Sequence, residues 1–346
     1  IVNDGVITVK LNENHPGNLA LSGFQSRIID ALELADDYID FSTYDKNDNN
    51  NIERNELQIM FLVAGGESTL TSGTGISAKK SCVTGLLANL EVPTVDGVKV
   101  MSCNDNGTYS RFGEKHANNN NATIGIIAHE LGHAIFELPD LYDLNGGSYG
   151  IGYFGLMGWG LHTKKEGEVL GNTPVHMSAY AKIKAGFITP TVLTTSTNNV
   201  AVIGTYINNS NIIKINTDNP GEYFLIENRA AGGYDLGFYS LENKTFTGGL
   251  AIWHIDENQP DNKEETHKLV DLEEPSTNPV LDAQISKGKI TNLYFTGNID
   301  SSNDEKNSFT TATFPSSKKY DGTSSGINIT NISVSGDIMY MDVEIL

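Results

Sequence analysis

The sequence predicts an α+β protein of two lobes: a first lobe over residues 1–190 with a twisted sheet and helices, and a β-rich second lobe over residues 191–346. The first observation is a helix-like apolar run from Ala122 that carries two histidines one turn apart. The second is a change after Pro190 to short alternating strands separated by Asn, Gly and Ser. The third is the length of 346 residues, which fits two domains.

The first lobe is expected to begin with an amphipathic helix from about Phe24 to Tyr38. Apolar residues are then almost continuous over residues 57–64, which predicts a buried strand. The helix from Ala122 carries the histidines, and a further helix near 176–185 is expected to pack behind them.

Several short runs with turn signals between them predict a β-sandwich-like second lobe that packs on the first. The predicted strands are Val200–Ile207, Ile212–Ile215, Glu222–Ile226, Leu250–Ile255, Ile290–Leu293, Ile327–Val334 and Met339–Ile345.

A twelve-residue polar loop precedes the first strand and has the spacing of a calcium-binding loop. Its ligands would be Asp45, Asn47, Asn49, Asn51 through its carbonyl, and Glu56. Asn50 replaces the usual glycine, and Asn is the residue that next best tolerates a left-handed backbone. Three ligand positions are neutral, so we expect a weak structural site that fills where calcium is plentiful, as outside cells. A solvated polar loop is the alternative.

The chain has two cysteines, Cys82 and Cys103, which is the right number for one disulfide in a secreted protein. A pair of reduced buried cysteines is the alternative reading. Nothing nearby indicates a thiol nucleophile.

His129, Glu130 and His133 form a zinc-hydrolase motif in the helix that starts near Ala122. Residues four apart lie on one face of a helix, so both imidazoles can reach one metal ion. Glu130 points to a neighbouring face, where it can take a proton from the metal-bound water and deliver it to a leaving amine. The motif therefore predicts a zinc peptidase with Glu130 as general base.

The alternative is a solvated polar face that carries these three residues by chance. The helix argues against it, because it is apolar on both sides of the motif and has Gly132 between the ligands.

Further blocks follow the motif in an order that is specific to one family. They are Leu138–Asp143, Gly146–Gly160, Pro174–Phe187, Gly221–Arg229, Gly249–Asn258 and Leu269–Glu274. With them, the chain resembles the M6 family of secreted bacterial metallopeptidases, the immune inhibitor A type, over about residues 40–345.

The resemblance implies a metzincin-like zinc peptidase lobe and a secreted endopeptidase that acts on protein or peptide substrates. It makes Met157 the methionine of a tight turn beneath the metal, although a gap-filling buried Met is an equally ordinary role. Tyr149, Tyr153 and Trp159 would form one wall of the cleft.

The third zinc ligand departs from the metzincin pattern, because Phe136 stands where a glycine would end the helix and Pro139 stands at the ligand position. Neither residue can bind zinc. The helix must end before Pro139, since proline disfavours a helical residue in front of it. Asp140 is then the leading candidate. Asp143 is the second and Glu137 the third; a loop-stabilising or calcium-binding role is the alternative for the loop acids.

The chain carries a formal net charge of -20, with 23 basic and 43 acidic residues. This charge makes nucleic acid or an anionic membrane an unsuitable partner. No apolar run reaches the roughly 18 residues of a membrane span. Since the chain starts at Ile1 with no visible signal peptide, we expect a secreted, monomeric zymogen product whose signal and propeptide have been removed.

Three hypotheses of function follow. The leading one is a secreted zinc-dependent endopeptidase; the others are a calcium-stabilised binding or adhesion module with a degenerate peptidase site, and another zinc hydrolase. The stretch Phe136–Asp140 is one residue longer than the Gly-Leu-Pro-Asp stretch of the family it resembles, and this difference favours the binding module. The intact Glu130 disfavours it, because a binding module has no use for a general base. The family resemblance disfavours the third.

Overall fold

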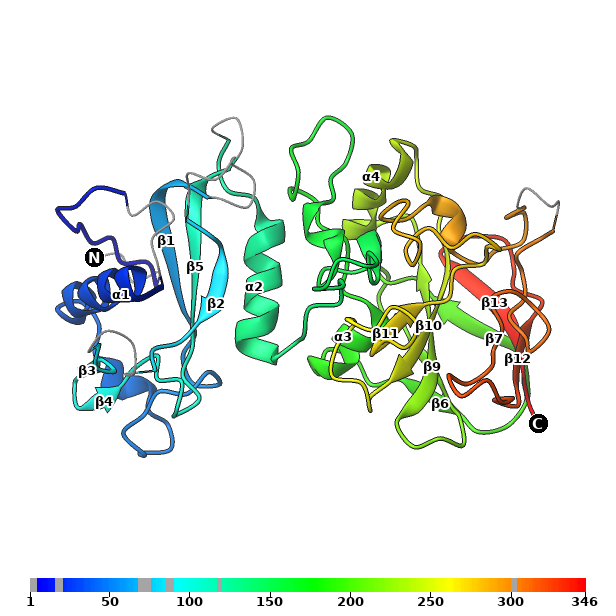
Figure 1. Ribbon diagram of the computed structural model, residues 1–346, viewed down its shortest axis with the longest axis horizontal. Coiled ribbons are helices and arrows are strands. Elements are labelled where there is room, and N and C mark those ends of the chain that lie inside the picture. Colours follow the sequence, from blue (N-terminus) through cyan, green and yellow to red (C-terminus); the bar gives the residue numbers. More distant parts are fainter. Residues whose placement is uncertain (1–4, 16–20, 68–75, 85–89, 117–119, 300–303) are drawn as a thin grey trace. The chain divides into compact units, whose positions relative to one another are not determined.

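The structure is a computed structural model that describes all residues except 1–4, 16–20, 68–75, 85–89, 117–119 and 300–303 (Figure 1). Its internal contacts divide the chain into two compact units, Ile1–Glu137 and Leu138–Leu346. This division falls earlier than the domain boundary expected near residue 190. The division describes how the chain packs and does not test where the catalytic domain ends, so the boundary at residue 190 stays a prediction.

The mixed α+β class is confirmed, since both units combine helices and small sheets. The helices and strands of the first unit are α1 (Leu21–Asp36), η1 (Phe41–Tyr44), β1 (Ile59–Gly66), β2 (Lys79–Ser81), β3 (Thr94–Val95), β4 (Val98–Lys99), β5 (Tyr109–Lys115) and α2 (Ile124–Phe136).

A three-stranded sheet of order β1-β5-β2 forms the centre of the first unit. β1 is parallel to β5, and β2 is antiparallel to it, so β2 is an edge strand. α1 covers one face and α2 the other (Figure 1). α1 packs there because Phe24, Ile28 and Leu32 recur at helical spacing and bury against the apolar side of β1.

Cys82 and Cys103 form the expected disulfide, with an S–S distance of 2.12 Å. Backbone hydrogen bonds from Val83 to Met101 and from Cys103 to Val83 join the same two segments. The disulfide therefore fixes the chain directly after β2.

The second unit begins with a glycine-rich segment and continues into strands. Its elements are η3 (Gly152–Phe154), η4 (Trp159–His162), α3 (Ala179–Lys184), β6 (Thr191–Leu193), β7 (Thr197–Ile203), β8 (Ile213–Asn216), β9 (Glu222–Arg229), η5 (Gly233–Phe238), α4 (Tyr239–Glu242), β10 (Gly249–Asp256), β11 (Val270–Leu272), η6 (Ile290–Asn292), β12 (Ile327–Thr330) and β13 (Ile338–Ile345).

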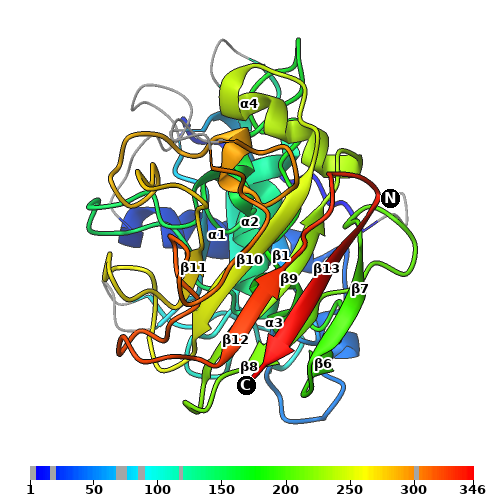
Figure 2. The same cartoon turned by 90° about the vertical axis from the view of Figure 1, so that its right-hand side faces the viewer.

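Two sheets share one core in this unit, a five-stranded sheet of order β11-β10-β9-β8-β6 and a three-stranded sheet of order β12-β13-β7 (Figure 2). Side chains such as Phe224 and Ile252 from the larger sheet and Met341 from the smaller one bury in the same cluster. The metzincin-like description of the first lobe and the β-sandwich-like description of the second stay predictions.

Most expected elements are present with shifted ends, and two expectations are wrong. The strand expected to be buried, β1, is only half-buried, because its side chains alternate between the two faces of the sheet and Met60 and Leu62 are exposed. Residues Ile290–Asn292 form a 3-10 turn, and only Tyr294 beyond them makes an isolated bridge to Leu250. The expected helix near 176–185 is shorter, Ala179–Lys184, with the Ser178 hydroxyl accepting from the Ala181 N–H at its start.

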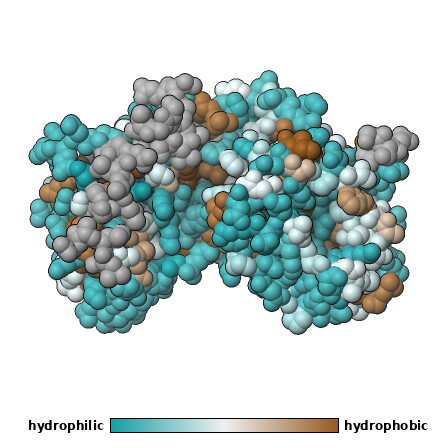
Figure 3. Space-filling view, in the orientation of Figure 1, coloured by the Kyte–Doolittle hydropathy of each residue, from teal (hydrophilic) through white to brown (hydrophobic). Residues whose placement is uncertain are grey.

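The face drawn in Figure 3 is mostly hydrophilic, as expected for a chain with a net charge of -20. Among the described residues, no helix is long and apolar enough to cross a membrane.

Candidate active site

Helix α2 ends where the sequence requires. Its last residue is Phe136, and Glu137 adopts a left-handed conformation with φ 54° and ψ 30° while its N–H donates to the carbonyl of Gly132. The chain can then leave the helix before Pro139, which cannot continue it. The expected end of the helix before Pro139 is confirmed.

His129 and His133 face each other across one turn of α2. Their Nε2 atoms are 3.1 Å apart, and the rings meet edge to face with centroids 4.6 Å apart. His129 is buried, and the residues around the two histidines in α2 are apolar.

Asp140 completes a group of potential metal ligands with the two histidines. One ligand atom from each of His129, His133 and Asp140 lies within 4.8 Å of the others. Within the part of the chain that the structure describes, no other group of three His, Cys, Asp or Glu side chains meets that condition. Two imidazole nitrogens and one carboxylate oxygen are a donor set that suits a single transition-metal ion.

The two other acids proposed for the third ligand have different contacts. Asp143 is buried, and its carboxylate accepts hydrogen bonds from the N–H groups of Asn145 at 2.7 Å, Gly147 at 2.7 Å and Ser148 at 3.0 Å. Glu137 forms an ion pair with Arg54 at 2.6 Å, and its side chain is 68% exposed. Neither belongs to the group formed by the histidines.

Glu130, between the two histidines, is held by the edge strand of the sheet. Its Oε2 accepts a 2.7 Å hydrogen bond from the backbone N–H of Lys80 in β2. In the described part of the chain, β2 pairs with β5 alone, and the Lys80 N–H donates to a side chain of the adjoining helix instead of to another strand.

Met157 lies in a tight part of the second unit, next to the loop that carries Asp140. It is 1% exposed, and its carbonyl accepts a 2.8 Å hydrogen bond from the N–H of Leu141. Gly150 has φ +53°, and a Cβ there would lie 2.2 Å from the carbonyl oxygen of Leu141. A glycine is therefore required for this close approach. The role of Met157 beneath a metal stays a prediction.

The aromatic residues of the glycine-rich segment gather around a lysine that the sequence did not reveal. The Lys287 ammonium lies 3.6 Å from the ring centroid of Trp159 and about 6 Å from those of Tyr149 and Tyr153. The N–H of Tyr153 also donates to the Lys287 carbonyl. Burial, followed by the charge of Tyr149, raises the pKa of Tyr153. Whether these rings form one wall of the substrate cleft stays a prediction.

The predicted calcium loop is closed by its own acidic and amide side chains. Asp45 accepts from the N–H groups of Asn49 and Asn50, and Glu56 accepts from those of Lys46 and Glu53. Asn50 has the expected left-handed backbone, with φ 62°. Asn47 and Asn49 each accept from the N–H two residues ahead, in the loop that leads to Asn51.

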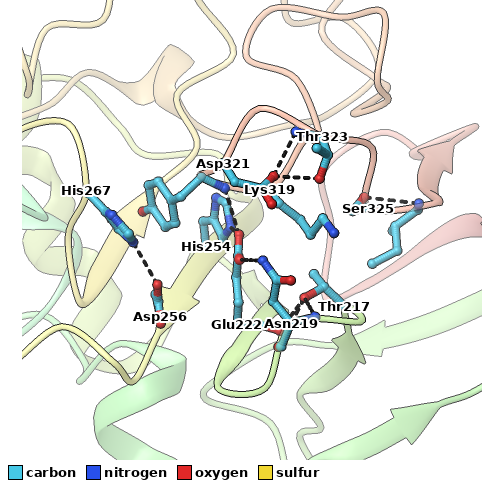
Figure 4. Close-up of polar contacts among 12 residues, drawn as sticks. Thr217, Asn219, Glu222, His254, Asp256, His267, Lys319, Asp321, Thr323 and Ser325 are labelled. Atoms are coloured by element: carbon cyan, nitrogen blue, oxygen red, sulfur yellow. Dashed lines mark hydrogen bonds and ion pairs between the residues drawn. The ribbon is translucent and has the colours of Figure 1, made fainter.

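A buried cluster in the second unit uses ionisable side chains for structure (Figure 4). His254 lies between Glu222, 2.9 Å from its Nε2, and Glu273, 3.1 Å from its Nδ1. Its ring stacks on Tyr320, which stacks in turn on His267. Burial disfavours the charge on His254, but the hydrogen bonds to the two glutamates outweigh it and raise its pKa to about 9. Both ring nitrogens of His254 therefore have carboxylate partners, which favour its charged form.

Two facing histidines on a helix, a nearby carboxylate and a glutamate between the histidines in sequence form an arrangement that suits a metallopeptidase. The family model described as immune inhibitor A peptidase M6, catalytic domain, matches residues 12–187, just over half of the chain. The chain belongs to the M6 family of peptidases, as the sequence resemblance indicated. A search of curated proteins found no match.

Proposed function

We propose that this protein is a secreted zinc-dependent endopeptidase that hydrolyses peptide bonds of extracellular proteins. The observation that carries the proposal is the group of His129, His133 and Asp140 on either side of the end of α2. Ligand atoms in a tetrahedral zinc site lie about 3.3–3.6 Å apart, given bonds of about 2.0–2.2 Å. The 3.1 Å separation of the two imidazole nitrogens is close to that value.

His129, His133 and Asp140 would hold the zinc, which supplies a water nucleophile at neutral pH and polarises the scissile carbonyl. Asp143 would keep the loop after Asp140 in shape through its three backbone hydrogen bonds. This division of roles favours Asp140 as the third ligand over Asp143, because Asp140 belongs to the group formed by the two histidines and Asp143 does not.

Glu130 would act as the general base and then as the general acid. Its Oε2 is oriented by the Lys80 N–H, which leaves Oε1 to accept a proton and return it to the leaving amine. The hydrogen bond fixes the carboxylate without consuming both oxygens, which is what a proton-transfer group requires.

A weak structural calcium site at Asp45, Asn47, Asn49, Asn51 and Glu56 accompanies this proposal. The left-handed backbone of Asn50 supports it, because the sharp turn of a calcium loop needs that conformation. The disulfide supports secretion, since such bonds persist in oxidising compartments.

Digestion of casein by the purified protein, with and without a zinc chelator, tests the proposal. We expect cleavage that the chelator abolishes and that zinc restores. Casein binding without cleavage at any zinc concentration would favour the binding or adhesion module. Chelator-sensitive hydrolysis of small esters or amides with no cleavage of casein would favour another zinc hydrolase.

A further inference from the structure

The end of the active-site helix contains a strained residue that must be held in place. Glu137 has φ 54°, a left-handed conformation that costs an ordinary side chain energy and that glycine adopts freely. It lies three residues before Asp140, so its backbone sets the direction in which the chain carries that carboxylate. A relaxed Glu137 would turn the following segment elsewhere.

Arg54 is the residue that holds Glu137. Its Nη1 lies 2.6 Å from Oε1 of Glu137, and its side chain is only 14% exposed. Its Nη2 also donates to the side-chain oxygen of Asn106, and its backbone N–H donates to the Asn106 carbonyl at 3.1 Å. The arginine is thus anchored at both ends before it reaches the helix.

The contact between Arg54 and Glu137 links the predicted calcium loop to helix α2. Arg54 is part of the twelve-residue loop Asp45–Glu56, immediately after Glu53, whose N–H donates to Glu56. A loop held in one conformation therefore holds the Arg54 side chain in place, and the ion pair in turn holds the last turn of α2.

Lys80 belongs to the same group of charges. Its pKa is lowered first by burial and then by Arg54, while Glu137 raises it. The backbone N–H of this same residue holds Glu130. Arg54 and Glu137 consequently lie beside both parts of the proposed centre, the turn to the third ligand and the strand that orients the base.

We propose that Arg54 is a positioning residue that holds the left-handed turn at Glu137 and so places Asp140 to bind zinc. This inference rests on the proposed zinc site. Arg54 touches neither the metal ligands nor a substrate, and it acts through the backbone of residues 137–140. The loop that carries Arg54 is the candidate calcium loop, so an ordered loop favours a formed zinc site.

The test measures the zinc dissociation constant by chelator competition, together with the absorption spectrum of the cobalt-substituted protein. Because Glu137 is largely exposed, its ion pair is screened and the effect is modest. We expect Arg54→Ala to weaken zinc binding by about three- to tenfold and to broaden the cobalt spectrum. Arg54→Lys should keep most of the affinity, because it keeps the charge.

A rescue experiment separates positioning from general stability. Glycine adopts the left-handed conformation without help, so Glu137→Gly should make Arg54 dispensable. We expect the double variant Arg54→Ala/Glu137→Gly to bind zinc nearly as tightly as the wild type. Arg27→Ala, which breaks an ion pair with Glu13 elsewhere in the same unit, is the matched control and should leave zinc affinity unchanged.

Wild-type affinity in Arg54→Ala, or a double variant no better than the single one, would overturn the inference. So would an equal loss in Arg27→Ala, because the loss would then follow from general destabilisation. A wild type that binds zinc but cleaves no protein would contradict the proposed function alone, since the comparison of dissociation constants still decides the role of Arg54. A wild type that binds no zinc would overturn both.

Discussion

The backbone N–H of Lys80 donates a 2.7 Å hydrogen bond to Oε2 of Glu130, so the edge strand β2 orients a carboxylate of helix α2. Two elements distant in sequence therefore combine at one side chain. The helix supplies the residue, and the strand limits its rotation. This arrangement limits the orientations of Glu130, which stands between the two histidines in the sequence of α2.

Replacement of Glu130 by Gln should leave zinc bound while proteolysis falls by at least about a hundredfold, the usual effect of losing a general base. Glutamine keeps the size of the side chain and can still accept from Lys80 through its oxygen. Zinc content by atomic absorption and casein digestion measure the two effects. Glu33→Gln, an exposed change in α1, is the control. Near wild-type digestion by Glu130→Gln would remove Glu130 from the mechanism.

The two loop acids should respond differently to removal. Asp140→Ala should lose zinc on dialysis, because only two protein ligands remain. Asp143→Ala should keep zinc at first but lower the melting temperature, because three N–H groups lose their acceptor. The N–H of Ser148 is the buried one, and leaving it without an acceptor costs roughly 1–3 kcal/mol. Measurements of zinc content and thermal unfolding of both variants decide which acid is the third ligand. The reverse ranking would give the ligand role to Asp143, and no loss from either would place the third ligand elsewhere.

The sequence predicts the local parts of this site. His129 and His133 meet because a helix repeats every 3.6 residues, and that spacing is visible in the sequence. The end of the helix before Pro139 is visible for the same reason. The contacts of Arg54 with Glu137 and of Lys80 with Glu130 cannot be predicted in this way. They depend on how distant segments pack, and no short-range pattern in the sequence encodes that packing.

The central strand β5 shows how polar side chains hide a buried element. Tyr109–Lys115 contains Ser110, Arg111 and Glu114, which gives no apolar run, yet Ser110 and Arg111 are buried. The strand lies between β1 and β2 with a helix on each face, and Arg111 stacks its guanidinium 4.1 Å from the ring centroid of Phe24. Burial here follows from position in the sheet rather than from hydrophobicity.

Calcium should stabilise the protein at millimolar concentration. At ten times a dissociation constant of about 0.5 mM, bound calcium adds about 1.4 kcal/mol, which raises the melting temperature by about 2–4 °C. A calcium titration followed by thermal unfolding, at constant zinc, measures this shift. Glu56→Gln should abolish it. Asp48→Asn is the control, because it removes one charge from the loop at a position that is not a ligand. Asp48 has φ 56°, a conformation that asparagine tolerates, so this variant should keep the shift in melting temperature. A wild type insensitive to calcium would leave the loop as a solvated turn.

The stability of the second unit should fall as the pH rises from about 6.5 to about 9 because of His254. The pKa of this residue is raised to about 9 in the folded protein, whereas an unfolded histidine titrates near 6.5. The charged form is thus favoured by folding, and the stabilisation is complete below pH 6.5. It disappears as the pH passes through the folded pKa, for a loss of about 3 kcal/mol.

Urea unfolding at several pH values between 6 and 9.5, in the Glu130→Gln background to prevent self-digestion, measures this dependence. His254→Gln should remove most of the slope above about pH 7.5, because the group that gains a proton on folding there is then lost. Glu273→Gln should reduce it, since one of the two carboxylates that raise the pKa is neutralised. The pKa values of Glu274 and Asp271 are also raised, chiefly by burial, to about 7. Their ionisation destabilises the folded protein, but it is largely complete by about pH 8 and adds little to the slope above that pH. A slope between pH 7.5 and 9 that persists in His254→Gln would show that another group carries the charge.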